Sequence, residues 1–275
     1  MTPQMGKFLK REKEFKMKYC VCTDALYMGK ADLPDATAEV KALGIEAYEF
    51  WFWWDHDLDV LKKKQDALGL TCAAICAKFF QNPGDPAAQE AYLSDFRDSV
   101  AAAKKLSCRK LIVQAGWEKL GISREAHRET LLATLEKASD IAAEEGITLV
   151  LEPLNIKVDH PGYHLWDTDD AFGVIRKVNR PNVKLLFDIY HQQISNGNIL
   201  DSITNNLELI GHIHCAGVPG RHEIGGGELN YRNIFAKLKE VGYPEYVGPV
   251  SYTHLDVYKR QVSSKSDGTI YCIVS

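Results

Sequence analysis

The stretch TLVLEPLN, residues 148–155, decides the fold and raises the first question about function. Apolar and β-branched residues lead directly into Glu152 and Pro153, a pattern that predicts a short buried strand ending at the glutamate. Burying a carboxylate without a partner costs free energy, so a strand that ends in this way needs a reason for its last residue.

Seven other short apolar runs lie along the chain at a regular spacing, at residues 17–26, 46–53, 70–79, 109–116, 183–191, 209–217 and 245–250. The runs are continuous rather than alternating, as is typical of parallel strands covered on both faces. Amphipathic segments with helix start and stop signals lie between them, at 85–106, 123–146 and 167–178. In the second segment Ser123 is a candidate N-cap, and Gly146 lies just past the helix end.

Eight such β-α units in one chain predict a (β/α)8 TIM barrel, which we place at residues 17–248. A doubly wound open sheet is the alternative. That fold usually carries a glycine-rich loop after its first strand, and the residues that follow the first apolar run here, Thr23 to Leu26, contain no glycine.

Composition excludes several classes of protein. The chain has 275 residues and a net charge of −4, without a basic stripe, so a nucleic-acid partner is not expected. No apolar run is long enough to span a membrane.

Seven cysteines and a charged N-terminus without a signal-peptide pattern predict reduced thiols and a cytoplasmic location. Cys20 with Cys22, and Cys72 with Cys76, could be metal pairs, but their apolar surroundings favour small buried residues. A homo-oligomer is compatible with the sequence.

In a TIM barrel the active site forms at the carboxyl ends of the strands. Glu152, Asp188 and His214 lie at this end of three successive predicted strands. Two carboxylates and an imidazole suit Mn²⁺ or Mg²⁺, with Co²⁺ or Zn²⁺ as alternatives. Each residue alone could instead be a salt-bridge or capping residue. His212 shares a strand face with His214, and we expect it to pack in the core.

Two further residues are candidates for contact with a substrate. Arg221 lies in the glycine-rich loop 218–231 and suits a carboxylate or a phosphate, although it could be a solvated loop residue. His191 follows the strand that ends at Asp188, and a structural role explains it equally well. The aromatic run 51–54 could wall the pocket, while part of it is expected to fill the core.

Three runs together are specific for a family: LVLEPLN (149–155), FDIYHQQI (187–194) and IGHIHCAGVPGRHEIGGGELNY (210–231). They resemble the hydroxypyruvate isomerase-like group of the xylose isomerase-like (sugar isomerase/epimerase) TIM barrel superfamily. That superfamily also contains ketose 3-epimerases and DNA repair enzymes of the endonuclease IV type. The segments VCTDALYMG, EFWFWWD and HPGYHL also resemble the group, and the similarity covers residues 17–248.

The resemblance implies that Glu152, Asp188 and His214 ligate a divalent metal, that Glu152 is the base, and that His191 and Arg221 contact the substrate. It implies an isomerase that interconverts hydroxypyruvate and 2-hydroxy-3-oxopropanoate through an enediolate. Members of the group often carry glutamine in place of His214, whereas the epimerases carry histidine, so a ketose 3-epimerase is the alternative. A DNA-cleaving hydrolase would need more metal-binding histidines and a cationic face.

The end of the chain departs from the family pattern. The family places a second metal-binding glutamate where Val250 stands, and residues 249–275 lack helical periodicity. The run PVSYTHLDVYKRQ (249–261) resembles non-native sequence at the ends of unrelated assembled gene fragments. We therefore expect an incomplete last strand and helix, and an inactive truncated barrel is a further possibility, as is a diverged natural tail. Residues 1–16 are expected to be a charged extension, with Met1 or Met17 as the true start.

Overall fold

The computed structural model describes residues 16–27, 31–252, 263–264 and 270–271. Its main sheet is parallel and has the strand order β1-β9-β8-β7-β6-β5-β4-β3-β2. The strands of this sheet are β1 (Lys18–Tyr19), β2 (Val21–Cys22), β3 (Ala47–Phe50), β4 (Thr71–Cys76), β5 (Lys110–Gln114), β6 (Thr148–Glu152), β7 (Val183–Asp188), β8 (Ile210–Cys215) and β9 (Tyr246–Pro249). A separate antiparallel pair joins β10 (Ser263–Ser264) to β11 (Ile270–Tyr271).

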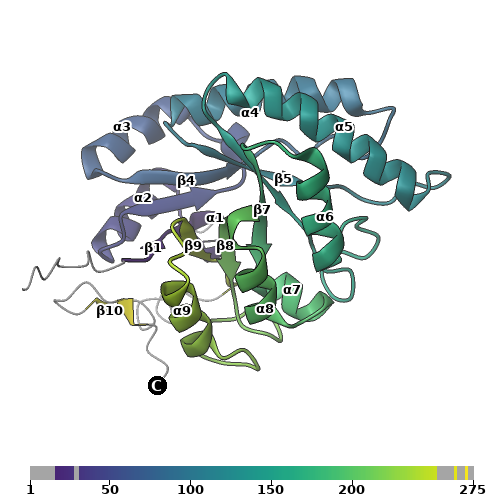
Figure 1. Ribbon diagram of the computed structural model, residues 1–275. Helices are drawn as coiled ribbons and strands as arrows, with labels where there is room; N and C mark the ends of the chain where they lie inside the picture. The colour runs from purple at the N-terminus through teal and green to yellow at the C-terminus, as the bar shows by residue number, and fades with distance from the viewer. Residues whose placement is uncertain (1–15, 28–30, 253–262, 265–269, 272–275) are drawn as a thin grey trace, which may run out of the picture.

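The main sheet closes on itself through its first strand. β1 and β2 are two halves of that strand, separated by Cys20. β1 pairs with β9, and β2 pairs with β3. The Cys20 amide also donates to the Val247 carbonyl at 3.1 Å. The predicted TIM barrel is therefore confirmed, and Figure 1 shows its strands surrounded by helices.

The described helices follow the strands in the alternation that the sequence predicts. They are α1 (Thr23–Tyr27), α2 (Leu33–Ala42), α3 (Leu58–Leu68), α4 (Gln89–Lys105), α5 (Arg124–Ala143), α6 (Thr168–Val178), α7 (Ile189–Ser195), α8 (Ile199–Asn205) and α9 (Tyr231–Glu240), with 3-10 turns η1 (Trp53–Asp55) and η2 (Leu207–Leu209). Ser123 caps α5 as predicted, because its hydroxyl accepts from the Ala126 amide. Asp57 caps α3, and Gly69 ends that helix in the left-handed conformation.

The strands are shorter than their apolar runs, and the first two runs show why. The run 17–26 is a strand only as far as Cys22, and the run 46–53 only as far as Phe50. The Thr23 hydroxyl donates to a β3 carbonyl at 3.1 Å, and the Asp24 carboxylate accepts from the two amides that follow β3, at 2.7 and 3.1 Å. These contacts turn the chain into α1, which apolar periodicity alone does not reveal.

Apolar side chains, small in one layer and larger in the next, fill much of the barrel interior. One layer contains Cys20, Ala47 and Ala73, and the next contains Ala74, Cys76, Ile112, Val150 and Leu186. The six described cysteines, at positions 20, 22, 72, 76, 108 and 215, are all buried. The predicted burial of Cys22, Cys72 and Cys76 is confirmed, and Cys20 also touches a carboxylate described below.

The structure describes only part of the two end segments that the sequence sets apart from the barrel. The expected extension 1–16 lies outside the described residues except for residue 16, and so does the tail from residue 253 apart from β10 and β11. Contacts with the barrel continue beyond residue 248, because the Val250 amide donates to Cys215 and the Tyr252 amide to Arg221. None of the helices in the described ranges is both long and apolar enough to cross a membrane.

Candidate metal centre

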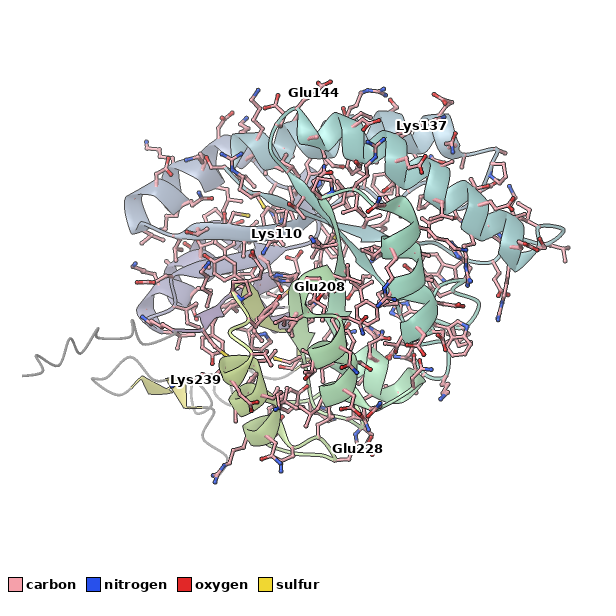
Figure 2. All side chains as sticks on the ribbon, viewed as in Figure 1. Lys110, Lys137, Glu144, Glu208, Glu228 and Lys239 are labelled. Atoms are coloured by element: carbon pink, nitrogen blue, oxygen red, sulfur yellow. The ribbon has the colours of Figure 1, made fainter. Side chains whose placement is uncertain are left out.

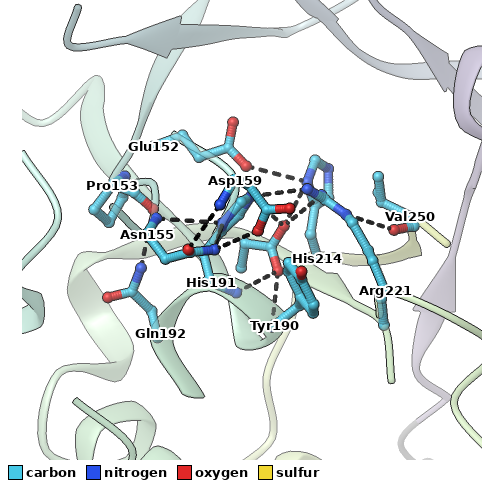
Figure 3. Close-up of polar contacts among 12 residues, drawn as sticks. Glu152, Pro153, Asn155, Asp159, Tyr190, His191, Gln192, His214, Arg221 and Val250 are labelled. Carbon is cyan, nitrogen blue, oxygen red and sulfur yellow. Dashed lines mark hydrogen bonds and ion pairs between the residues drawn. The ribbon is translucent and has the colours of Figure 1, made fainter. Parts of the chain in front are cut away.

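The three predicted metal ligands meet at the mouth of the barrel. Glu152 is the last residue of β6, Asp188 is the last residue of β7, and His214 lies one residue before the end of β8. Asp188 and His214 are directly paired in the register between β7 and β8. Figure 3 shows their side chains pointing toward one another, so the sequence prediction of their proximity is confirmed.

The geometry of this group fits a divalent cation. One donor atom from each of Glu152, Asp188 and His214 lies within 4.8 Å of the others. His214 Nδ1 is 3.6 Å from Glu152 Oε1 and 3.9 Å from Asp188 Oδ2. All three side chains are buried, and in the described part of the chain neither ring nitrogen of His214 has a well-aligned hydrogen-bond partner. Two carboxylates and an imidazole nitrogen are hard-to-borderline donors that Mn²⁺, Mg²⁺ or Zn²⁺ accepts.

The electrostatics of His214 depend on its carboxylate neighbours. Burial disfavours the imidazolium, but Glu49 and then Glu152 outweigh burial and raise the pKa of His214 to about 10. A cation that binds Nδ1 must therefore displace a proton, and metal binding at this centre releases protons.

Asp188 performs two tasks with its two oxygens. Oδ1 caps α7 by accepting from the amides of Tyr190 and His191, at 2.8 and 3.3 Å. Oδ2 faces the metal centre and accepts from Arg221 Nη2 at 2.9 Å. Because α7 begins directly at the strand end, the same turn of backbone fixes the orientation of the carboxylate.

Arg221 is buried beside the centre, so the interpretation of this residue as a solvated loop arginine is wrong. Its Nε donates to the Val250 carbonyl at 3.0 Å, and its Nη1 lies 2.8 Å from His191 Nε2. The guanidinium also lies over the rings of Tyr190 and Tyr252, at 5.0 and 5.5 Å from their centroids. The loop that carries Arg221 bends sharply here, because Arg221 itself has φ +56°.

His191 is held as a neutral ring. Burial, and then the charge of Arg221, lower its pKa well below the ordinary value. The Asn155 side-chain amide donates to His191 Nδ1 at 2.7 Å, and the Asn155 backbone amide lies 3.3 Å from the same atom. Donors face both ring nitrogens, because Arg221 can only donate across its 2.8 Å contact with Nε2. His191 and Arg221 therefore form one hydrogen-bonded pair at the mouth.

Val250 stands where the resemblance implies a fourth ligand. It is fully buried, and it packs against Cys22, Ala25 and Trp51. The described residues thus bring three predicted ligands together and place an isopropyl group at the fourth position. Figure 3 shows Val250 beside Arg221, at the end of β9.

The sequence interpretation missed Glu49, a fully buried carboxylate on β3. Glu49 Oε2 accepts from His212 Nε2 at 2.7 Å, and Glu49 Oε1 lies 2.9 Å from His214 Nε2. Burial opposes its ionisation, but His214 and then His212 outweigh burial and lower the pKa of Glu49 well below the ordinary value. The apolar run 46–53 begins with Glu46 and carries a second charged residue, Glu49, in its middle, and this second charge was the signal that could have revealed it.

The aromatic run 51–54 divides between the pocket and the core. Trp53 is buried and donates through Nε1 to the Cys76 carbonyl at 2.9 Å. Trp51 is half-buried and packs on the upper interior layer of the barrel and on Val250. Phe52 is 37% exposed. Trp51 is therefore the member of the run that packs on the barrel interior beside Val250.

Fold and side chains together define a closed parallel α/β barrel with a buried cluster of acidic and histidine donors at its mouth. The model of the xylose isomerase-like TIM barrel family matches residues 37–256. This chain belongs to that family.

Two relatives and one solved structure are similar to this chain over most of its length. The chain is 36% identical over 225 residues to the 2-oxo-tetronate isomerase of Cupriavidus necator, covering 78% of this chain and 85% of that protein. It is 32% identical over 237 residues to the hydroxypyruvate isomerase of Escherichia coli, covering 82% and 89%. A solved structure described as an AP endonuclease of family 2 from Brucella melitensis aligns with a TM-score of 0.81 at 28% identity, covering 86% and 93%.

Proposed function

We propose that this chain is a divalent-metal-dependent isomerase of small 2-oxo acids, with hydroxypyruvate as substrate and 2-hydroxy-3-oxopropanoate as product. The observation that carries the proposal is the position of Arg221, which is only 6% exposed and contacts Asp188 of the metal centre. A buried guanidinium suits a carboxylate, which both acids carry. The two isomerases at 36% and 32% identity support the reaction class.

The fixed position of the guanidinium supports the argument for a carboxylate. Arg221 Nη1 donates to His191 Nε2 at 2.8 Å, and Nη2 donates to Asp188 Oδ2 at 2.9 Å. Each of these nitrogens carries a second N–H, which a substrate carboxylate can accept.

The roles of the residues follow from their positions. A divalent cation held by Glu152, Asp188 and His214 would polarise the substrate carbonyl. Arg221 and His191 orient the carboxylate, and Trp51 excludes water from one side. Glu152 takes the proton from carbon 3 of hydroxypyruvate and returns it to carbon 2, while the hydroxyl proton moves to the former carbonyl oxygen. The product is an isomer, so no external oxidant or reductant is required.

A substrate panel with Mn²⁺ tests this proposal. Initial rates would be compared for hydroxypyruvate, 2-oxo-tetronate and neutral ketoses such as D-fructose and D-tagatose. We expect turnover of the two acids and none of the ketoses. Inversion of a ketose at carbon 3, faster than turnover of either acid, would overturn the assignment.

A ketose 3-epimerase is the second candidate, and His214 is the observation that favours it. The resemblance places histidine at this position in the epimerases and often glutamine in the hydroxypyruvate group. The buried Arg221 opposes it, because a ketose carries no carboxylate. The same panel therefore separates the two candidates.

A DNA-cleaving hydrolase and an inactive truncated barrel have less support. For the hydrolase, the groups of metal donors found among the described residues contain one histidine each, and Figure 2 shows acidic and basic side chains intermixed around the molecule. For the inactive barrel, Val250 in place of a glutamate is the supporting observation, and an exchange assay that requires a single base addresses it directly.

The cellular setting forms part of the proposal. Free buried thiols at the six described cysteines suit a reducing compartment, so we place the enzyme in the cytoplasm. Its partner is a small molecule, and a homo-oligomer is compatible with the proposal; size-exclusion chromatography with light scattering would measure its mass.

A further inference from the structure

Glu49 lies directly beneath the candidate metal centre, on the barrel-interior side of His214. Its Oε1 is 2.9 Å from His214 Nε2, while the other ring nitrogen, Nδ1, faces Glu152 and Asp188. The imidazole thus stands between a buried carboxylate below and the metal donors above. Neither the fold nor the proposed reaction assigns a role to this glutamate.

We propose that Glu49 is a positioning residue that keeps the proton of His214 on Nε2, so that the Nδ1 lone pair is available to the metal. The inference rests on the proposed function. The 2.9 Å contact between His214 Nε2 and Glu49 Oε1 is close, although it is not well aligned as a hydrogen bond. A carboxylate can only accept, so Nε2 is the nitrogen that keeps its hydrogen when Nδ1 binds a cation. Metal-ligating histidines commonly donate their other N–H to a carboxylate, which fixes the ring and increases its basicity.

The surroundings of Glu49 hold its carboxylate in place for this task. His212 Nε2 donates to Oε2 at 2.7 Å, and the Cys20 thiol donates to the same oxygen at 3.4 Å. Gly248 on β9 leaves room for the group, because a Cβ there would lie 2.7 Å from Oε1. His212 is therefore not simply a packing residue, as the sequence suggested, but a donor that orients Glu49.

Cys20, Glu49 and His212 could instead be a second cation site, since their donor atoms also lie within 4.8 Å of one another. The chemistry opposes that reading. The Cys20 thiol and His212 Nε2 both donate to Glu49 Oε2, so these donors are already engaged with one another, and we assign the group a hydrogen-bonded support role.

Charge balance agrees with a support role. A divalent ion and Arg221 supply positive charge that matches the carboxylates of Glu49, Glu152 and Asp188 when His214 is neutral. Without Glu49 the buried cluster would carry one uncompensated positive charge. Glu49 therefore contributes to metal affinity both through the orientation of His214 and through its charge.

Calorimetric titration of the metal-free protein with Mn²⁺ tests the inference without relying on activity. We expect Glu49→Gln to weaken Mn²⁺ binding about 10- to 100-fold, the range seen when the partner of a metal-bound histidine is removed. Glu49→Leu removes the acceptor entirely and should weaken binding at least as much. Cys20→Ala is the matched control, because it removes a contact to Oε2 and leaves the contact to His214; its affinity should stay within about threefold of wild type.

A double-mutant cycle with His214→Gln distinguishes positioning from a general structural effect. A glutamine ligand binds through its carbonyl oxygen and has no tautomer to fix. Glu49→Gln should therefore weaken binding less in the His214→Gln background than in the wild type. Equal losses in both backgrounds, or no loss from Glu49→Gln in the wild type, would overturn the inference while leaving the metal centre intact. Absence of Mn²⁺ binding by the wild type would overturn both the inference and the proposed metal dependence.

Discussion

At the scale of single residues, Glu152 shows why a buried strand ends in a carboxylate. The strand places it at the barrel mouth, 3.6 Å from His214 Nδ1, where a cation can neutralise it. Its backbone carbonyl accepts from the Tyr163 hydroxyl at 3.1 Å, which fixes the strand end on which the side chain stands. In the proposed reaction this one residue therefore supplies both a metal ligand and a base.

Arg221→Lys tests carboxylate recognition at this scale. Lysine keeps the positive charge but loses the planar fork, so we expect KM for hydroxypyruvate to rise about 10- to 100-fold, with a smaller change in kcat. Steady-state kinetics would measure both constants. Proton exchange of dihydroxyacetone, which has no carboxylate, serves as the control and should change much less. An unchanged KM for hydroxypyruvate would contradict the assigned role.

At the scale of elements, one residue at the site both ends a strand and caps the helix that follows it. Asp188 ends β7 and caps α7 at once, so its carboxylate is held at the candidate metal centre without a long supporting loop. Other helices have caps remote from the site. A substitution at one of these remote caps should lower stability without changing activity, so it separates the two effects.

Asp57→Ala tests this separation. The Asp57 carboxylate accepts from the amides of Asp59 and Val60 at 2.9 and 3.2 Å at the start of α3. Its loss should lower the free energy of unfolding by about 1 kcal/mol, as for other N-caps, and leave kcat/KM unchanged. Urea unfolding measures the first quantity, and Asp57→Asn, which retains the cap, is the control. A fall in kcat/KM larger than the fall in stability would show that α3 and the site are coupled.

The sequence allowed much of this architecture to be predicted, because the signals are local. Continuous apolar runs predicted the strands, and Ser123 predicted the start of α5. The proximity of Glu152, Asp188 and His214 followed because each lies at or next to the end of its strand, and parallel strands end on the same side. Each of these predictions used only the residues of one segment and the point at which that segment ends.

Contacts between distant segments account for what the sequence did not reveal. Glu49 is separated by more than a hundred residues from His212 and His214, so only the closed barrel brings them together. The run 17–26 was predicted to be a longer strand, because the contacts from Thr23 and Asp24 that start α1 reach across to the end of β3. The burial of Arg221 likewise depends on Val250 and Tyr190, which lie on other elements.

At the scale of the whole molecule, the last strand determines how complete the metal centre is. Val250→Glu should restore a fourth carboxylate. In the metal-free protein this buried acid should reduce stability by about 2 kcal/mol, and Mn²⁺ should then raise the midpoint of thermal unfolding more than it does in the wild type. Val250→Leu is the apolar control and should keep the wild-type response to Mn²⁺. A smaller Mn²⁺-induced rise in Val250→Glu would place position 250 outside the metal centre.

Buried neutral histidines make stability depend on pH. Burial, opposed by a hydrogen bond to the Ala115 carbonyl, lowers the pKa of His164 to about 4. Between about pH 6.5 and pH 4 this histidine binds a proton in the unfolded chain but not in the folded protein. The free energy of unfolding therefore falls as pH falls through this window, by roughly 3 kcal/mol in all from this residue. His214, whose pKa is raised, contributes stability that is fully present below about pH 6.5 and is lost progressively as pH rises from there to about 10.

Urea unfolding at pH 7.5 and 5.0 checks this prediction. The wild type should lose about 2 kcal/mol more between these values than His164→Gln does. The exposed His222 provides the control substitution, and His222→Gln should retain the wild-type loss. The same loss in His164→Gln as in the wild type would contradict the assignment of a neutral buried His164.

The central claim is that Glu152 and a divalent cation at this mouth remove a proton from a 2-oxo acid. Deuterium incorporation into hydroxypyruvate in D2O, followed by NMR with and without Mn²⁺, tests it most directly, because exchange needs one base and does not require the missing fourth carboxylate. We predict Mn²⁺-dependent exchange at carbon 3 that falls 10²- to 10⁴-fold, about the usual contribution of a general base, in Glu152→Gln. Exchange that is absent in the wild type, or that persists unchanged in Glu152→Gln, would contradict the account.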